Sequence, residues 1–429
     1  MALSRPRIAR ALLLADVAII ALAIIALAVF GSRPVWASGA SPVPSATPTL
    51  SPQGQQLQAM VHDGSLAALR WPNFSDYLGQ VEMFYSSGGY ALAWTEAGRL
   101  TSQATVMLEH LRHADVKGLN PEDYDASRWD ARLAKLAPAN RSPAAADLRD
   151  FDLAMTVSAM RFLSDLSIGR VNPHHVKFSV AIGMKKYDLA DFLRQLVIHA
   201  EDVNRVIATA EPHYDGYARA ETALATYTRL AAQGDGSPLP AVQKSVRPGG
   251  DYPGVPQLVA RLRQLGDLAP DAQLPAGPTQ YAGAIVKAVE HFQGRHGLDP
   301  DGVLGKSTIA DLNVPLSQRV RQLQYALERY RWIPPAFAQP PIIVNLPEFV
   351  LRTMRRQPAP FLTMRVIVGK AYRKQTPVFT GNMQYVIFRP YWNVPLSIQQ
   401  QELVPKLSRD RSYLATHGFE VVDGNQVVT

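Results

Sequence analysis

The sequence predicts a multidomain α+β protein: a mainly α-helical scaffold and a three-helix domain, followed by an incomplete β-rich domain. Three observations predict it. Apolar residues recur at helical spacing in the first half of the chain, a helix–turn–helix pattern occupies residues 284–315, and short β-branched or aromatic runs follow residue 340. A chain of 429 residues has room for roughly three domains.

The composition is that of ordinary globular domains, with 47% apolar and 19% charged residues. The net charge of +8 and the pI of about 9.5 leave room for an anionic partner, but no dense basic run interleaves with aromatic residues, so we expect no nucleic acid. The chain has no cysteine, which excludes disulfides and thiol nucleophiles within it. We expect no cofactor and no metal, because Glu109, His110 and His113 lack further ligands at a recognisable spacing.

The first segment predicts export. Residues 1–10 form a basic, cytoplasmic N-terminus, and residues 11–31 are apolar apart from Asp16, close to the ~20 residues that span a bilayer. Two alternatives remain open: an uncleaved signal-anchor, or a signal peptide cleaved near Val35-Trp36-Ala37. Either one exports the protein, and we expect it in the periplasm, anchored in the inner membrane by residues 11–31.

An extended Pro/Ser linker follows at residues 32–53. Residues 54–250 form the predicted helical scaffold domain. Leu153, Val157 and Met160, for example, make one apolar stripe at helical spacing, and Gly169 ends that helix.

The helix–turn–helix pattern is the most specific local signal. Four apolar residues fall at i, i+3, i+4 and i+7 on its first helix, which Gly297 ends, and a tight turn follows at 299–302. Ser307 or Thr308 is expected to cap the second helix. The four apolar residues are Ile285, Ala288, Val289 and Phe292.

This pattern resembles the peptidoglycan-binding domain of many bacterial cell-wall enzymes, and we assign residues 251–315 to such a domain. The resemblance implies the stem peptides and glycan of peptidoglycan as partners. Val289 and Phe292 are interpreted as core residues, so the contacts are expected from loops and exposed polar groups nearby.

Residues 316–340 are predicted to form a connecting helix, Leu316–Trp332, and a linker. Residues 341–429 are predicted to be β-rich, with a candidate hairpin turn at Asp423-Gly424. The expected strands are Ile342–Val344, Phe349–Met354, Met364–Val368, Tyr385–Phe388 and Phe419–Val422.

Several further motifs occur in a fixed order: Glu328–Pro334, Ile343–Pro347, Met364–Lys370, Trp392–Pro395 and Glu402–Pro405. With the preceding domains they resemble the large L,D-transpeptidases of the YcbB type, which have a YkuD-like catalytic domain. The resemblance implies a cysteine that attacks the third residue of a tetrapeptide stem and expels the terminal D-alanine. An amine of a neighbouring stem then resolves the acyl-enzyme into a 3→3 cross-link.

In that family the catalytic His and Cys lie towards the end of the catalytic domain, and residues 341–429 resemble only the part before them. We therefore expect a partial catalytic domain, with no catalytic residue in this chain and weak stabilisation after Pro340. His417 matches a non-catalytic His-Gly pair. Trp392 and Asn393 are the only candidates for substrate contact, and Trp392 is alternatively a core residue.

The expected function is that of a peptidoglycan L,D-transpeptidase-family protein of cell-wall biogenesis. Without a nucleophile the chain as it stands is expected to be inactive. The alternative is a non-catalytic peptidoglycan-binding envelope protein.

Overall fold

A computed structural model describes residues 50–137, 142–171, 188–334, 340–354, 360–370, 375–388, 390–423 and 426–428. The chain divides into two units, Met1–Pro52 and Gln53–Thr429. The expected basic N-terminus and anchor at residues 1–31 lie outside the described residues, as does most of the expected linker.

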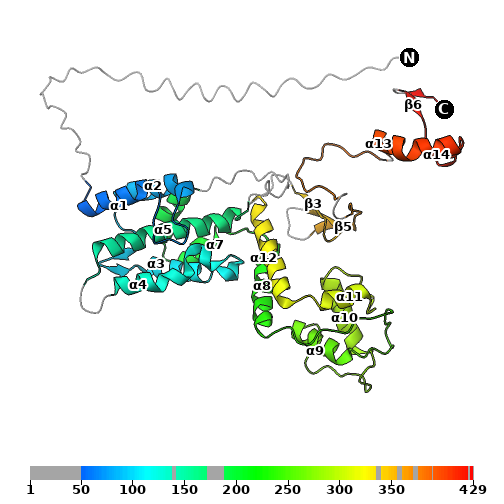
Figure 1. The fold of residues 1–429 in the computed structure, drawn as a ribbon, viewed down its shortest axis with the longest axis horizontal. Helices are drawn as coiled ribbons and strands as arrows, with labels where there is room; N and C mark the ends of the chain where they lie inside the picture. Colours follow the sequence, from blue (N-terminus) through cyan, green and yellow to red (C-terminus); the bar gives the residue numbers. More distant parts are fainter. Residues whose placement is uncertain are drawn as a thin grey trace, which may run out of the picture. The chain divides into compact units, whose positions relative to one another are not determined.

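The first part of the second unit is mainly helical (Figure 1). Two strands of two residues each, β1 and β2, pair there in antiparallel fashion. The predicted helical scaffold is confirmed. Its elements are α1 (Pro52–His62), α2 (Leu78–Ser86), β1 (Thr95–Glu96), β2 (Arg99–Leu100), α3 (Ser102–Arg112), α4 (Trp129–Leu136), α5 (Ala145–Ile168), α6 (Leu189–Asp191), α7 (Val203–Ala208) and α8 (Asp215–Ala232), with short 3-10 turns at Ser75–Tyr77, Ala114–Lys117, Pro121–Tyr124 and Ala126–Arg128.

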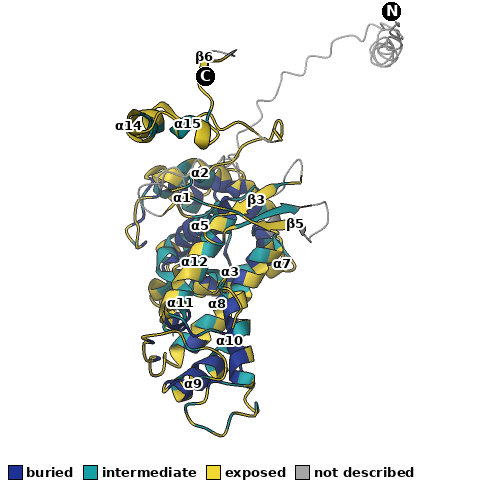
Figure 2. Cartoon of the chain, turned by 90° about the vertical axis from the view of Figure 1, so that its right-hand side faces the viewer, coloured by how far each residue is buried: buried dark blue, intermediate teal, exposed yellow. Residues whose placement is uncertain are grey.

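Helix α5 is the centre of this scaffold. The predicted stripe of Leu153, Val157 and Met160 has no exposed surface, and the buried part extends around the helix from Phe151 to Met160 (Figure 2). A helix surrounded by protein on all sides has no need of a polar face. Gly169 ends α5 with φ +85°, as predicted.

One carboxylate inside the scaffold holds the segment before β1. Asp152 of α5 is fully buried and accepts hydrogen bonds from the backbone N–H of Ala93 at 2.9 Å and of Trp94 at 2.8 Å. It also accepts from the Tyr85 hydroxyl at 2.8 Å. Burial outweighs these hydrogen bonds and raises the pKa of Asp152 to about 6.

The next part is a three-helix unit, as predicted, made of α9 (Val255–Leu265), α10 (Ala284–Arg295) and α11 (Lys306–Leu312). Its members bury a shared apolar core that includes Leu258, Leu262, Ile285, Val289 and Phe292. Two isolated antiparallel bridges, Val246 with Leu304 and Asp251 with Gln280, tie its loops together.

Helix α12 (Leu316–Trp332) has the bounds that the sequence predicts, and it lies along α8 (Figure 1). Leu327 of α12 shares a small core with Tyr217 and Leu224 of α8. The two helices therefore pack as a pair, and along the sequence they flank the three-helix unit.

The last turn of α12 is attached to the scaffold by polar contacts. Arg331 has no exposed surface; its guanidinium donates to the carbonyl oxygen of Lys117 and, at 3.1 Å, to the hydroxyl of Tyr217. Glu328 accepts from the backbone N–H of Val171 at 2.9 Å. These contacts fix the C-terminal end of α12, which leads into the last part of the chain.

That last part contains β3 (Ile342–Asn345), β4 (Val350–Met354) and β5 (Pro360–Arg365), an antiparallel sheet in the order β3-β4-β5. The short helices α13 (Leu396–Ile398), α14 (Val404–Arg409) and α15 (Tyr413–Thr416) follow. Strands β6 (Val422–Asp423) and β7 (Gln426–Val427) then pair in antiparallel fashion.

The strand predictions are only partly correct. The first two strands are confirmed, but the third begins earlier than predicted and ends at Arg365, and only the end of Phe419–Val422 is a strand. The prediction of a strand at Tyr385–Phe388 is wrong, because these residues form no strand and are exposed. A β-branched or aromatic run needs a pairing strand and a face to bury, and composition shows neither. The candidate turn residue Gly424 lies outside the described residues.

After Trp332, no residue whose side chain the structure describes is buried (Figure 2). Leu362 and Met364 of β5, for example, are 46% and 48% exposed. The predicted weak stabilisation of the chain after Pro340 agrees with this burial but stays a prediction, since burial alone measures no free energy of unfolding.

Candidate functional site

The candidate site is the loop between α10 and α11, residues 297–305, together with the start of α11. Helix α10 buries the predicted stripe, with Ile285 and Val289 fully buried. It ends at Arg295, and Gly297 follows at φ +75°, so the predicted stop is confirmed. The predicted cap is wrong: α11 begins at Lys306 after Gly305 and has no side-chain cap.

Thr308 has another role than capping. Its side chain is buried inside the unit, where its hydroxyl donates to the carbonyl oxygen of Val303 at 3.3 Å. The Thr308 hydroxyl oxygen also accepts a hydrogen bond from Nε2 of Gln293 at 3.2 Å. Thr308 therefore attaches the first turn of α11 to the loop.

Gln293 organises the loop from inside. It is 2% exposed, and its Nε2 donates to Oδ1 of Asp301 at 3.1 Å and to the carbonyl of Val303 at 3.1 Å. Its Oε1 accepts from the backbone N–H of Gly302 at 2.9 Å. One amide side chain thus satisfies several polar groups of the turn, which leaves the loop well ordered.

The turn at Gly302 is tightly enclosed. The Tyr281 hydroxyl donates to the carbonyl oxygen of Gly302 at 2.6 Å. Gly302 has φ +65°, and a Cβ atom there would lie 2.9 Å from Cγ1 of Val286. Only glycine combines this backbone conformation with this packing.

A groove of about 670 Å³ opens at this loop. Its wall is mainly the loop and the adjoining ends of α10 and α11, whose exposed polar groups include Asp299 and Ser307. Such a mixture of backbone, carboxylate and hydroxyl groups suits a polar ligand. The lining residues are Ser245, Gln293, Gly294, Gly297, Leu298, Asp299, Pro300, Asp301, Val303, Gly305, Ser307 and Thr308, with Glu348, Phe349, Val350 and Arg365 from the sheet part.

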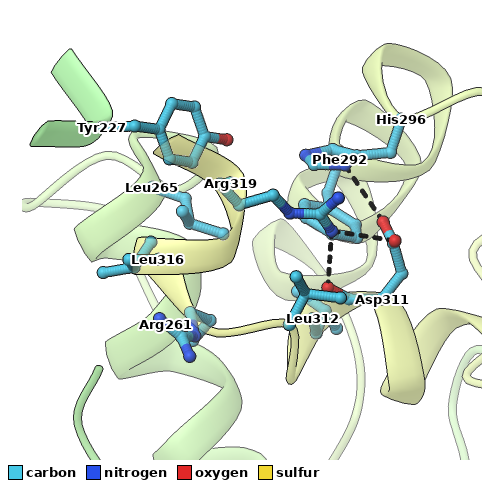
Figure 3. A pocket seen from close by; sticks show the side chains of 10 residues that line it. Tyr227, Arg261, Leu265, Phe292, His296, Asp311, Leu312, Leu316 and Arg319 are labelled. Atoms are coloured by element: carbon cyan, nitrogen blue, oxygen red, sulfur yellow. Dashed lines mark hydrogen bonds and ion pairs between the residues drawn. The ribbon is translucent and has the colours of Figure 1, made fainter. Parts of the chain in front are cut away.

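A second, very small cavity lies where the three-helix unit meets α12 (Figure 3). Figure 3 shows Arg319 reaching from α12 towards Asp311, which His296 also approaches. Asp311 lies 3.0 Å from Nδ1 of His296 and 2.8 Å from the Arg319 guanidinium. Burial opposes ionisation of Asp311, but the hydrogen bonds from His296 and Arg319 prevail and lower its pKa.

The cavity volume of about 10 Å³ is room for no more than one water molecule. We therefore interpret His296, Asp311 and Arg319 as an ionic joint between the three-helix unit and α12. Arg295 adds to the same boundary by donating to the Tyr227 hydroxyl of α8 at 3.1 Å.

The predicted substrate-contact residues lie elsewhere. Trp392 is 63% exposed, with its ring 6.4 Å from that of Phe419, and Asn393 is exposed. The alternative of a core position for Trp392 is therefore wrong. Neither residue lines the groove, and the structure does not test whether they contact substrate, so that role stays a prediction.

The side chains considered as metal ligands do not gather into a site among the described residues. His110 is paired with Asn204 at 2.8 Å, and His113 with Glu109 at 3.5 Å. Within the described ranges no group of three or more His, Cys, Asp or Glu side chains is arranged to hold a metal ion.

The role of Gln293 in holding the loop was not predicted from the sequence. Its only signal in the sequence is its position: it is a polar residue directly after Phe292, the last residue of the apolar stripe.

Comparisons with known proteins agree with this architecture. The scaffold domain family matches residues 79–224, the family described as "Putative peptidoglycan binding domain" matches residues 251–312, and the L,D-transpeptidase catalytic domain family matches residues 340–428. A protein of Haemophilus influenzae named "Putative L,D-transpeptidase" is 35% identical over 88 residues. That match covers 20% of this chain and 18% of the relative's length.

The chain therefore contains, in this order, regions similar to a scaffold domain, a peptidoglycan-binding domain and an L,D-transpeptidase catalytic domain.

Among the residues that the structure describes, no helix is both long and apolar enough to cross a membrane. The expected anchor at residues 11–31 is not among them.

Proposed function

We propose that this protein binds peptidoglycan through the loop 297–305 and the start of α11, within an enzyme system that makes 3→3 cross-links. The observation that carries the proposal is the ordered loop itself. Gln293 holds it from inside while Asp299 and Ser307 face the groove. Preorganised polar groups bind a polar polymer with little loss of conformational entropy.

The chemical step that we propose for the family is acyl transfer. A thiolate attacks the carbonyl carbon of the third stem residue, the C–N bond to the terminal D-alanine breaks, and the leaving amine takes up a proton. An amine of a second stem then attacks the thioester and releases the thiol. The 429 residues contain no cysteine, so we propose that they do not catalyse this step by themselves.

The ordered loop 297–305 would equally serve a second candidate, a non-catalytic peptidoglycan-binding envelope protein. An assay with tetrapeptide-bearing peptidoglycan tests whether this chain catalyses cross-linking. We expect the purified chain to form no 3→3 cross-links, and turnover by this cysteine-free chain would contradict the thioester mechanism.

Sedimentation with purified peptidoglycan sacculi tests the binding proposal. Ser307→Trp places a large side chain in the groove from an exposed position, and we expect it to leave most of the protein in the supernatant. Ser317→Trp, at an exposed position in the first turn of α12, is the matched control and should sediment like the unchanged chain. Equal sedimentation of both variants would remove the groove from the proposal.

We propose the other domains and sites at the residues that the sequence indicates. We propose residues 54–250 as the scaffold domain, 251–315 as the peptidoglycan-binding domain, 316–340 as the connection and 341–429 as the transpeptidase part. Trp392 and Asn393 are proposed substrate contacts. We further propose residence in the periplasm with inner-membrane anchoring through residues 11–31, which fractionation of the cell envelope would test.

A further inference from the structure

The four arginines of α12 fall into two pairs with different surroundings. Arg319 is joined to Asp311, and Arg331 is buried against Tyr217 and the Lys117 carbonyl. Arg321 and Arg329 are exposed, and they form no ion pair or side-chain hydrogen bond with any residue that the structure describes. Two cations of the helix are thus available to an outside partner.

These two arginines share one face of α12 with an exposed tyrosine. Arg321, Tyr325 and Arg329 lie at i, i+4 and i+8, and Tyr325 is 61% exposed. The opposite face packs on α8 through Val320, Leu323, Leu327 and Tyr330. We call Arg321, Tyr325 and Arg329 the α12 basic stripe.

The dimensions of the stripe suit a short peptide. Eight residues of helix rise about 12 Å between Arg321 and Arg329. An extended tetrapeptide spans about 13 Å. Two guanidinium groups at this separation match two carboxylates on one such peptide, and the tyrosine ring between them offers a flat apolar surface to the peptide backbone.

The position of the stripe along the chain supports the same partner. Helix α12 begins directly after the three-helix unit, at Leu316, and ends at Trp332, shortly before β3 begins the transpeptidase part. A stem peptide on a glycan strand held by the three-helix unit has to reach the transpeptidase part, and α12 is the segment that connects them.

We propose that the α12 basic stripe binds the carboxylate-bearing stem peptides of peptidoglycan. This inference rests on the proposed function, since it takes peptidoglycan as the polymer, but it concerns a second surface and the peptide rather than the loop 297–305. Charge complementarity selects the peptide: each exposed guanidinium gains a carboxylate partner that no described residue of the chain supplies.

The test measures binding of the full chain to two soluble fragments, a disaccharide that carries a tetrapeptide and the same disaccharide without peptide. The variant is Arg321→Gln with Arg329→Gln. The control is Arg219→Gln with Arg229→Gln, which removes the same charge from exposed positions of the neighbouring helix α8. Thermal unfolding verifies that both variants are folded, which we expect because all four side chains are exposed.

We expect the stripe variant to bind the tetrapeptide fragment about tenfold more weakly than the unchanged chain, with no change for the bare disaccharide. The α8 control should bind both fragments normally, and added salt should weaken tetrapeptide binding of the unchanged chain most. Tyr325→Ala should weaken binding of the tetrapeptide fragment as well.

Four outcomes overturn the inference. Equal tetrapeptide binding by the unchanged chain and the stripe variant shows that the stripe is a solvated surface, while sacculus binding through the loop 297–305 stands. An equal loss in the α8 control shows only a general charge effect. A loss seen with vesicles of anionic lipid but not with the tetrapeptide fragment assigns the stripe to a membrane surface. Failure of the unchanged chain to bind sacculi at all removes the proposed function and this inference together.

Discussion

Nε2 of Gln293 lies 3.1 Å from Oδ1 of Asp301, while Oε1 of the same Gln293 accepts from the next residue, Gly302, at 2.9 Å. One buried amide therefore holds both sides of the turn between α10 and α11. The groove at this loop derives its shape from Gln293, a residue of its lining that is only 2% exposed.

Replacing Gln293 by Leu should destabilise the three-helix unit. The leucine keeps the approximate volume but leaves the Gly302 N–H and the Asp301 and Thr308 side chains without their partner, at a cost of about 2–4 kcal/mol. Urea unfolding measures the change. Gln318→Leu, at an exposed position of α12, is the control and should change stability by less than about 0.5 kcal/mol. Similar losses in both variants would contradict the role of Gln293.

Two glycines of the loop form a matched pair. Gly297 and Gly302 both have positive φ, at +75° and +65°, but only Gly302 is enclosed: an added Cβ would meet Val286 at 2.9 Å and Glu290 at 3.2 Å. Gly297→Ala should cost about 1–2 kcal/mol for the backbone conformation. Gly302→Ala should cost about 1–3 kcal/mol more because of the added overlap. Thermal unfolding compares the two variants, and equal losses would show that the packing around Gly302 yields easily.

The helix–turn–helix part of the fold could be predicted because its signals are local. The spacing of Ile285 to Phe292 and the positive-φ glycines define helix, stop and turn without reference to the rest of the chain. The expected cap at Ser307 or Thr308 failed because a tertiary contact, the hydrogen bond from Gln293, draws Thr308 into the core. Propensity cannot anticipate such a partner.

The β-rich part was less predictable for a related reason. Tyr385–Phe388 has strand-like composition but no pairing strand among the described residues, and its side chains are exposed. Strand formation depends on long-range hydrogen bonds and on one buried face. The sequence likewise places Trp392 equally well in a core or on a surface, and only the structure shows that it is exposed.

Asp152 should make the stability of the scaffold depend on pH. Its folded-state pKa is raised to about 6 from the ordinary value of 3.8, chiefly by burial. The folded state therefore holds the proton more tightly than the unfolded chain. The resulting stabilisation is fully present below about pH 4 and is lost as the pH rises through 6, by up to about 3 kcal/mol.

Urea unfolding at several pH values between 4 and 7, compared with Asp152→Asn, isolates this contribution. The variant should be less stable throughout, because its amide N–H₂ faces the donors of Ala93, Trp94 and Tyr85. It should also lack the part of the pH dependence that belongs to Asp152. Asp115→Asn, at an exposed position, should keep the dependence of the unchanged chain. An unchanged slope in Asp152→Asn would refute the assignment.

Arg331 and Arg329 lie two residues apart on α12 in opposite surroundings. Arg331 has no exposed surface and donates to the Lys117 carbonyl and the Tyr217 hydroxyl, whereas Arg329 is exposed. Arg331→Met should cost about 3–5 kcal/mol, since the truncation leaves buried polar groups and Glu328 without their cation.

Arg329→Met should change stability by less than about 0.5 kcal/mol. Hydrogen exchange locates the effect: in Arg331→Met the amides of the last turns of α12 and of the facing part of α8 should exchange faster, while those of α10 remain protected. Faster exchange confined to the three-helix unit would mean that α12 is held by the His296–Asp311–Arg319 joint instead. Because Arg331 contacts the scaffold directly, we expect the loss at the scaffold end of the helix.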